Sequence, residues 1–168
     1  FVKPMLATLV ESPPSGEQWL HEIKHDGYRL IAVIAKGRAR LYTRSGHDWT
    51  DRFTGLAEGF EALGIRDAVI DGEAVAAGQR GTPDFSALQK AMSEGHPVQA
   101  VVFDLLHHNG HDLRDRPLRE RRERLHDLIG DATGAVRFGD SIAADGAQVL
   151  ARACDLGAEG VVSKRADG

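Results

Sequence analysis

Six short apolar stretches constrain the fold of this chain more than any other feature of its sequence. In each of them apolar side chains alternate with polar ones or run together briefly, and many are β-branched, which is typical of half-buried or fully buried strands. Short turns such as Asp26-Gly27 and Lys36-Gly37 separate neighbouring stretches. The pattern predicts an α+β domain built on antiparallel sheet, not a doubly wound parallel sheet. The predicted strands cover residues 19–24, 28–35, 38–43, 68–76, 99–106 and 160–164.

Helical spacing of apolar residues appears at four places along the chain. Pro117 suits the first position of one helix, whose leucines we expect to point inward and whose arginines we expect to point outward. Gly64 and Gly157 suit the ends of two others. The apolar helical positions are Phe53, Leu56, Phe60 and Leu63; Phe85, Leu88 and Met92; Leu118, Leu125, Leu128 and Ile129; and Val149, Leu150, Ala153 and Leu156. We expect loops over residues 11–16, 78–83 and 107–112.

The composition indicates one ordinary domain and narrows its partners. A length of 168 residues suffices for one hydrophobic core. The formal net charge of −4 argues against binding nucleic acid through bulk positive charge. Cys154 has no second cysteine to pair with, which favours a reducing compartment such as the cytoplasm, and we expect it to be a small buried hydrophobe. No stretch has the roughly 20 apolar residues that cross a bilayer, so we expect no membrane association.

The sequence has one pattern of the metalloprotease type and neither of the common glycine-rich phosphate motifs. The segment His21-Glu22-Ile23-Lys24-His25 has the spacing H-E-x-x-H, in which two histidines one helical turn apart bind zinc. That spacing requires a helix. These residues lie in a predicted strand, and no third ligand is evident, so we interpret the match as accidental.

A lysine between two acids is the more informative pattern. Side chains alternate between the two faces of a strand, so Glu22 and Lys24 share one face with Asp26. The full pattern is Glu22-x-Lys24-x-Asp26-Gly27-x-Arg29. Taken alone, it also fits a solvated lysine that precedes a hairpin turn.

Three further carboxylates accompany apolar strands. Asp71 and Glu73 stand within one predicted strand, and Glu159 immediately precedes another. Burying a carboxylate is costly unless it is paired or binds a metal ion. Each of the three, taken alone, also fits a strand-end acid in water. Together with the lysine pattern they predict a site for a nucleotide phosphate and a hard divalent cation.

Several segments, in this order along the chain, resemble the motifs of the covalent nucleotidyltransferases. Among these the chain is similar to the ATP-dependent DNA ligases, and most of all to the ligase module of bacterial DNA ligase D. The resemblance covers essentially the whole chain and implies an antiparallel-sheet adenylation domain of the ATP-grasp-like ligase type over residues 1–168. The matching segments are Pro4-Met5-Leu6-Ala7, Trp19-Leu20-His21-Glu22-Ile23-Lys24-His25-Asp26-Gly27-Tyr28-Arg29, Tyr42-Thr43-Arg44-Ser45-Gly46, Ile70-Asp71-Gly72-Glu73, Val102-Phe103-Asp104-Leu105 and Glu159-Gly160-Val161-Val162-Ser163-Lys164.

The resemblance implies a role for each matching side chain. Lys24 is the implied nucleophile, which attacks the α-phosphate of ATP, forms lysyl-AMP and releases pyrophosphate. This is physically reasonable, because a nearby divalent cation and a partly dry site disfavour the ammonium form. The other implied contacts are Glu22 with the adenine amino group, Arg29 with the ribose and the α-phosphate, Glu73 with the ribose or a metal ion, Phe103 with the adenine face, Glu159 with a metal ion, Lys164 with the phosphates and Arg44 with the 5′-phosphate of a nicked strand. The implied orienting residues are Asp26, for the turn and the lysine, and Asp71.

The resemblance also implies cofactors and partners. These are ATP as a covalent AMP intermediate, Mg²⁺ or Mn²⁺, and nicked or broken double-stranded DNA in bacterial non-homologous end joining. The bacterial Ku end-binding protein is a candidate partner, and a cytoplasmic, nucleoid-associated monomer is expected. A ligase continues beyond Lys164 into a strand with two more lysines and an OB-fold domain. We therefore expect this chain to be truncated before that strand and before the OB-fold domain, and to be incomplete for nick sealing on its own.

Two alternatives stay open. An RNA ligase or a GTP-using capping guanylyltransferase would use the same chemistry. A non-catalytic nucleic-acid-binding module would keep the fold, although the intact Lys24, Glu73 and Glu159 argue against it, because acids beside a phosphate backbone weaken binding.

Three remaining features fit structural roles. We expect the histidines of residues 107–111 to be solvated and Trp49 to pack at a helix start. An arginine cluster could contact a DNA backbone, but the acids interleaved with it favour an ion-paired helix face. Its members are Arg114, Arg116, Arg119, Arg121, Arg122 and Arg124, interleaved with Asp112, Asp115, Glu120, Glu123 and Asp127.

Overall fold

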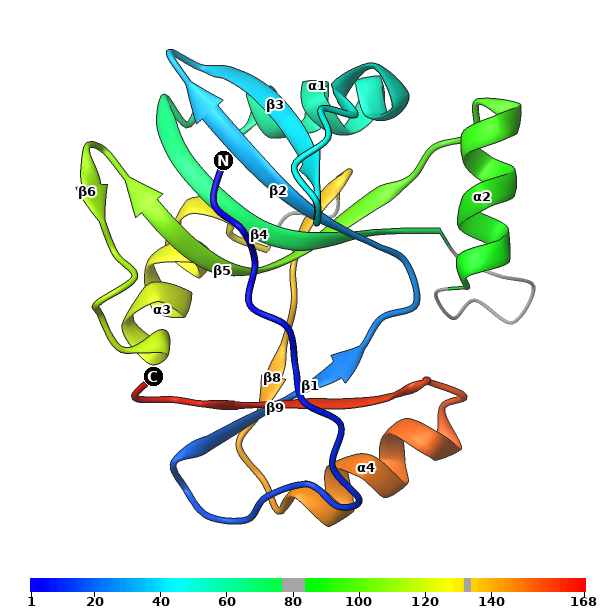
Figure 1. The fold of residues 1–168 in the computed structure, drawn as a ribbon, viewed down its shortest axis with the longest axis vertical. Coiled ribbons are helices and arrows are strands. Elements are labelled where there is room, and N and C mark those ends of the chain that lie inside the picture. Colours follow the sequence, from blue (N-terminus) through cyan, green and yellow to red (C-terminus); the bar gives the residue numbers. More distant parts are fainter. Residues whose placement is uncertain (77–83, 132–133) are drawn as a thin grey trace.

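Two sheets form the framework of the molecule. The computed structural model describes residues 1–76, 84–131 and 134–168. The larger sheet has the strand order β3-β2-β4-β5-β6, antiparallel throughout, and β7 pairs with β5 in parallel. Its strands, shown in the upper part of Figure 1, are β2 (Tyr28–Ala35), β3 (Arg38–Thr43), β4 (Asp67–Val75), β5 (Gln99–His108), β6 (His111–Asp112) and β7 (Val136–Phe138).

The smaller sheet lies below the larger one in Figure 1. Its order is β8-β1-β9, and both pairings are antiparallel. The strands are β1 (Trp19–Lys24), β8 (Ser141–Ile142) and β9 (Gly160–Arg165). The prediction of an α+β fold on antiparallel sheet is confirmed, and all six predicted strands are present with ends within two residues of the predicted ones.

The helices lie where the apolar spacing predicts them. A 3-10 helix (η1, Thr50–Phe53) follows Trp49 and leads into α1 (Thr54–Ala62), which packs on β3. The left-handed glycines that follow α1 and α4 are Gly64 (φ 73°) and Gly157 (φ 74°), as expected for helix ends. The remaining helices are α2 (Phe85–Glu94), α3 (Leu118–Ile129), which packs on β5 and β7, and α4 (Gly146–Asp155), which packs on β1 and β9. No helix in the described residues is long and apolar enough to span a bilayer.

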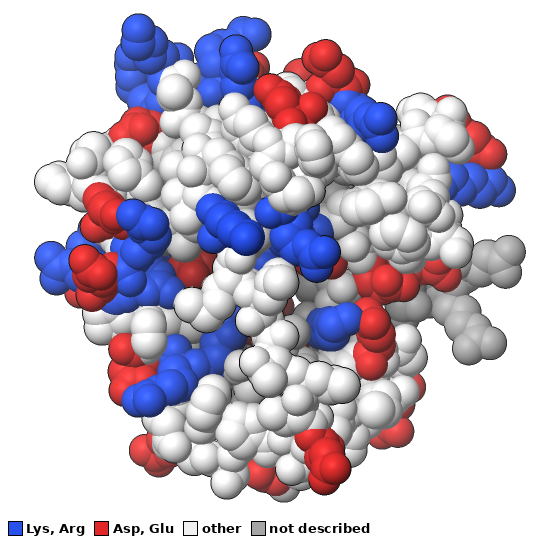
Figure 2. Space-filling model, in the orientation of Figure 1, with Lys and Arg blue, Asp and Glu red and all other residues white. Residues whose placement is uncertain are grey.

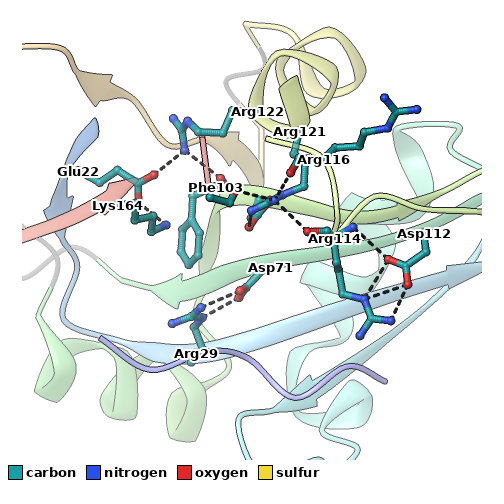
Figure 3. A network of polar contacts seen from close by, with 12 residues as sticks. Glu22, Arg29, Asp71, Phe103, Asp112, Arg114, Arg116, Arg121, Arg122 and Lys164 are labelled. Atoms are coloured by element: carbon teal, nitrogen blue, oxygen red, sulfur yellow. Dashed lines mark hydrogen bonds and ion pairs between the residues drawn. The ribbon is translucent and has the colours of Figure 1, made fainter. Parts of the chain in front are cut away.

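The two faces of the larger sheet carry different residues. Leu30, Ala32 and Ile34 of β2 belong to the hydrophobic core that α1 and α3 complete. Because side chains alternate along a strand, Arg29 lies on the opposite face, as do Asp71 and Glu73 of β4. This second face points toward the smaller sheet, and the polar site lies there (Figure 3).

Two predicted connections and the predicted burial of one side chain are wrong. Asp26-Gly27 does not close a hairpin, because β1 and β2 belong to different sheets and the segment crosses between them. Residues 107–112 are not a loop: β5 runs on to His108 and pairs with β6 across a tight turn at Asn109 (φ 48°) and Gly110 (φ 81°). Cys154 is exposed on α4, not buried. The predicted loop at 78–83 lies outside the described residues.

Candidate functional site

Lys24 ends β1 and lies beside the start of β9. Because Lys24 is opposite Gly160 in the antiparallel register, the residue before β9 is next to the lysine. That residue is Glu159, whose Oε2 lies 2.7 Å from the Lys24 Nζ. The two side chains are 46% and 49% exposed, so the ion pair stands at the surface. The predicted nucleophile and one predicted metal ligand are therefore neighbours, and both are accessible.

Glu22 lies two residues before Lys24 and is buried. Leu20 is opposite Lys164 in the register, which places Lys164 diagonally from Glu22 on the same face of the small sheet. The Lys164 Nζ lies 2.6 Å from Glu22 Oε2, and Arg122 Nη1 of α3 lies 2.6 Å from Glu22 Oε1 (Figure 3). Each oxygen of this carboxylate is thus held by a cation. The implied contact between Glu22 and the adenine stays a prediction.

Arg29 and Asp71 form a two-pronged ion pair on the larger sheet. Arg29 donates from Nε to Asp71 Oδ1 and from Nη2 to Asp71 Oδ2, each at a donor–acceptor distance of 2.6 Å. Asp71 is buried. Burial by itself lowers the pKa of Arg29, but the hydrogen bonds and the charge of Asp71 outweigh it, so that the pKa is raised. Asp71 therefore orients a charged Arg29 (Figure 3).

Glu73 lies opposite Arg29 in the pairing of β2 with β4. Burial raises its pKa to about 7, although Arg29, a hydrogen bond from the Gly27 backbone and Lys24 all favour the ionised form. A Cβ on Gly27 would collide with the carbonyl oxygen of Ala74. The glycine is thus required by the close approach of the segment between β1 and β2 to β4.

Phe103 stands at a β-bulge in the centre of the site. Asp71 pairs with Asp104 and Gly72 with Val102, so Phe103 is the extra residue on β5. The Lys164 Nζ lies 4.0 Å from the centroid of the Phe103 ring, and the Arg29 Cζ lies 4.9 Å from it. One cation comes from each sheet, at distances suited to cation–π attraction. Bulges recur beside active sites, where they redirect a side chain.

Two predicted site residues lie at the margin of this cluster. The Asp26 carboxylate accepts a hydrogen bond from the backbone N–H of Phe85 over 3.1 Å, so it joins the crossover between the sheets to the start of α2. Arg44 is exposed in the turn that follows β3. Its implied contact with a 5′-phosphate, and the orienting role of Asp26 toward the lysine, stay predictions.

The prediction that all arginines of α3 point outward is wrong for two of them. Arg121 and Arg122 are buried. Arg121 donates to both oxygens of Asp104, and Arg122 pairs with Glu22. The sequence contained a signal for this: the buried residues of α3 recur with helical spacing on one face. They are Leu118, Arg121, Arg122, Leu125 and Ile129.

The histidines of the H-E-x-x-H pattern do not form a zinc site. His21 lies within β1 and His25 follows its end, so neither is on a helix. His21 is fully buried, with its Nδ1 2.8 Å from the hydroxyl of Ser163. Within residues 1–76, 84–131 and 134–168 there is no group of three His, Cys, Asp or Glu side chains that could hold a metal ion.

The surface over the site carries both signs of charge. Figure 2 shows Lys and Arg side chains interspersed with Asp and Glu across the middle of the face where the two sheets meet. In the site itself, Lys24, Lys164 and Arg29 are each paired with an acid. A phosphate-bearing ligand would compete with these acids for the three cations.

The raised pKa of Glu73 gives a testable pH dependence of stability. The unfolded chain releases this proton near 4.5 and the folded chain near 7. Between these values the folded state holds more protons, so the free energy of unfolding falls as the pH rises. We expect the free energy of unfolding, measured with urea, to fall between about pH 5 and pH 8 by about 1–3 kcal/mol more in this protein than in Glu73→Gln. Parallel pH profiles for the two proteins would contradict this.

Comparison with known proteins agrees with this geometry. The family "ATP dependent DNA ligase domain" matches residues 4–168. The multifunctional non-homologous end joining protein LigD of Pseudomonas aeruginosa is 48% identical over an alignment of 168 positions, which covers 98% of this chain and 20% of that protein. LigD of Mycobacterium tuberculosis is 37% identical over 165 residues, covering 98% of this chain and 21% of that protein. The chain thus spans about a fifth of the length of these relatives.

Solved structures show the same fold. A mycobacterial DNA ligase D complexed with ATP and MES superimposes with a TM-score of 0.88 at 35% identity, covering 98% of this chain and 54% of that one. The Chlorella virus DNA ligase-adenylate superimposes with a TM-score of 0.70 at 19% identity, covering 99% of this chain and 62% of that one, which shows the fold alone. From the family match over nearly its whole length, the chain belongs to the ATP-dependent DNA ligase domains.

Proposed function

We propose that this chain is the adenylating part of an ATP-dependent DNA ligase, with Lys24 as the nucleophile. One observation carries the proposal: Phe103 has a cation from each sheet against its ring, and one of these cations is paired with Glu22, two residues before the accessible Lys24 on β1. An aromatic face suits a nucleotide base, and Arg29 and Lys164 suit its phosphates. The match to the ligase D structure with ATP supports ATP as the nucleotide.

The chemistry follows from the surroundings of Lys24. The amine forms a bond to the α-phosphorus, the bond from that phosphorus to the α,β-bridging oxygen breaks, and pyrophosphate leaves with the electron pair. A lysine attacks only after its ammonium group has lost a proton. The Glu159 carboxylate, 2.7 Å from Nζ, is within reach of that proton. Arg29 and Lys164 would hold the phosphates against the lysine, and Phe103 would hold the base.

Glu73 and Glu159 fit a divalent cation by their chemistry. Both are carboxylates, the ligand type that Mg²⁺ and Mn²⁺ prefer. Glu159 forms an ion pair with Lys24, and the charge of Lys24 favours the ionised form of Glu73. Burial raises the pKa of Glu73, and a bound cation would favour its ionised form. When bound, Mg²⁺ or Mn²⁺ would offset the charge that builds on the phosphate oxygens.

We extend the proposal to the rest of the ligase reaction. AMP passes from Lys24 to a DNA 5′-phosphate, and the nick is sealed when the 3′-hydroxyl displaces AMP. The LigD relatives are named for non-homologous end joining, which supports repair of broken bacterial DNA as the setting. Within that setting we propose a monomer that acts in the cytoplasm at the nucleoid, with the Ku end-binding protein as partner.

The competing functions separate in two experiments. Intact-mass spectrometry after incubation with ATP or GTP and Mg²⁺ should show an AMP adduct and no GMP adduct. A GMP adduct would favour a guanylyltransferase. Sealing assays of the full polypeptide on nicked duplexes should then show joining of DNA over RNA, since the reverse preference would favour an RNA ligase. Binding of DNA without any nucleotide adduct would favour a non-catalytic binding module.

Arg44 provides a prediction that separates the steps. A guanidinium binds phosphate with two parallel hydrogen bonds, and Arg44 is exposed for such a contact. In the full polypeptide we expect Arg44→Ala to seal nicked DNA on the order of tenfold or more slowly while it forms lysyl-AMP at the normal rate. Gel assays of ligation and of radiolabelled adduct formation measure the two rates. An equal loss in both would show that Arg44 serves the nucleotide and not the DNA end.

A further inference from the structure

Arg122 is a buried arginine of α3 whose guanidinium contacts segments from both sheets. Nη1 donates to Glu22 Oε1 of β1 over 2.6 Å and to the carbonyl oxygen of Phe103 of β5 over 2.9 Å. Nη2 donates to the carbonyl oxygen of Gly139, which follows β7, over 2.5 Å. The guanidinium also lies 4.7 Å from the ring centroid of Phe138. A single planar group is thus bonded to the small sheet, to the bulge at Phe103 and to the end of β7, and it holds these three segments in place relative to one another (Figure 3).

The contact with Glu22 reaches the nucleotide site through a second ion pair. Glu22 uses its other oxygen to hold the Lys164 Nζ at 2.6 Å. That ammonium lies 4.0 Å from the centroid of the Phe103 ring, whose own backbone carbonyl Arg122 also holds. Arg122 therefore acts on the cation and on the aromatic ring together. Arg122 and Glu22 have side chains only 5% and 9% exposed, so water competes little for these bonds.

We infer that Arg122 is a positioning residue for adenylation: by holding Glu22 and the Phe103 backbone, it places Lys164 over the Phe103 ring where the nucleotide binds. The inference rests on the proposed function. A lysine cannot replace Arg122, because an ammonium is a point charge and cannot serve a carboxylate and two carbonyls in the fork geometry of a guanidinium.

Arg121 is a matched comparison within the same helix. Like Arg122, it is buried and paired with an acid. Its partner is Asp104 of β5, to which it donates two hydrogen bonds. Its remaining hydrogen bonds go to backbone oxygens of Arg114, Arg116 and Gly168. None of these groups is assigned a nucleotide contact. A substitution at Arg121 thus reproduces the loss of a buried guanidinium without disturbing Glu22 or Lys164.

The test compares Arg122→Lys with Arg121→Lys in the full polypeptide. The rate of lysyl-AMP formation is measured against ATP concentration with Mg²⁺, and stability is measured by urea unfolding. We expect Arg122→Lys to lower the rate at saturating ATP on the order of tenfold or more, because small misplacements of a transition-state contact are costly. Arg121→Lys should lose comparable stability and keep the rate within about twofold. Equal losses of rate in the two variants would overturn the inference.

A double-variant cycle tests whether Arg122 acts through Lys164. If it does, combining Arg122→Lys with Lys164→Ala should slow adenylation little more than Lys164→Ala alone. Glu22→Gln, which keeps the shape of the side chain, should show the same rate loss and the same lack of additivity, even if Arg122→Lys does not fold. Fully additive rate losses would contradict the inference. Absence of lysyl-AMP in the unsubstituted protein would instead contradict the proposed function.

Discussion

Lys24→Ala in the full polypeptide is expected to abolish lysyl-AMP formation and nick sealing, with a loss on the order of 10⁴-fold or more in rate. Removal of a covalent nucleophile leaves no alternative group to carry the intermediate, and effects of this size are typical of such residues. The substitution should leave the fold intact. Lys24 and Glu159 form an ion pair with side chains about half exposed, and such pairs contribute about 1 kcal/mol or less.

The matched control for this variant is Lys90→Ala. Lys90 is an exposed lysine on α2, so its loss should change neither the adduct nor the urea unfolding curve. Single-turnover assays with labelled ATP measure both proteins. Retention of the adduct in Lys24→Ala would show that another group carries AMP, and a large drop in its stability would show that Lys24 holds the fold instead.

Asp71→Ala should give a large loss of stability. It leaves the guanidinium of Arg29 without its partner between the sheets, and breaking a buried ion pair in this way costs about 3–5 kcal/mol. Arg29 would also lose the two hydrogen bonds that orient it. We therefore expect adenylation to slow on the order of tenfold or more at conditions where the variant is folded.

An exposed ion pair of similar geometry provides the control. Asp112 also accepts hydrogen bonds from Arg114 through both oxygens. Its side chain is 52% exposed, against 6% for Asp71. Asp112→Ala should therefore cost about 1 kcal/mol or less in urea unfolding. Similar losses for Asp71→Ala and Asp112→Ala would contradict the importance of burial, and Asp71→Asn, which keeps the size of the side chain, provides a milder variant for kinetics.

The strands and helices could be predicted from the sequence because their signals are local. Alternation and β-branching identify a strand such as β2 without knowledge of its partners. The pairing of strands is not local. Asp26-Gly27 has the composition of a hairpin turn, but Gly27 serves a close approach to the carbonyl oxygen of Ala74 far along the chain. The same residues therefore cross between sheets, and only the assembled structure shows it.

The site was predictable as a set of residues but not as a set of contacts. The carboxylates on apolar strands and the lysine pattern indicated Lys24, Asp71 and Glu73 as members of one site. The bulge at Phe103 depends on how two strands pair, so no property of β5 alone reveals it. Arg122 was missed because a charged residue is expected at the surface, although its helical spacing placed it on the apolar face of α3.

The central claim is tested most directly by locating the adduct. The protein is incubated with ATP and Mg²⁺, digested under conditions that preserve the phosphoramidate bond, and analysed by tandem mass spectrometry. We expect one AMP per chain, attached to Nζ of Lys24 and removed by added pyrophosphate. AMP on another side chain, such as Lys164, or no AMP on any peptide, would contradict this claim.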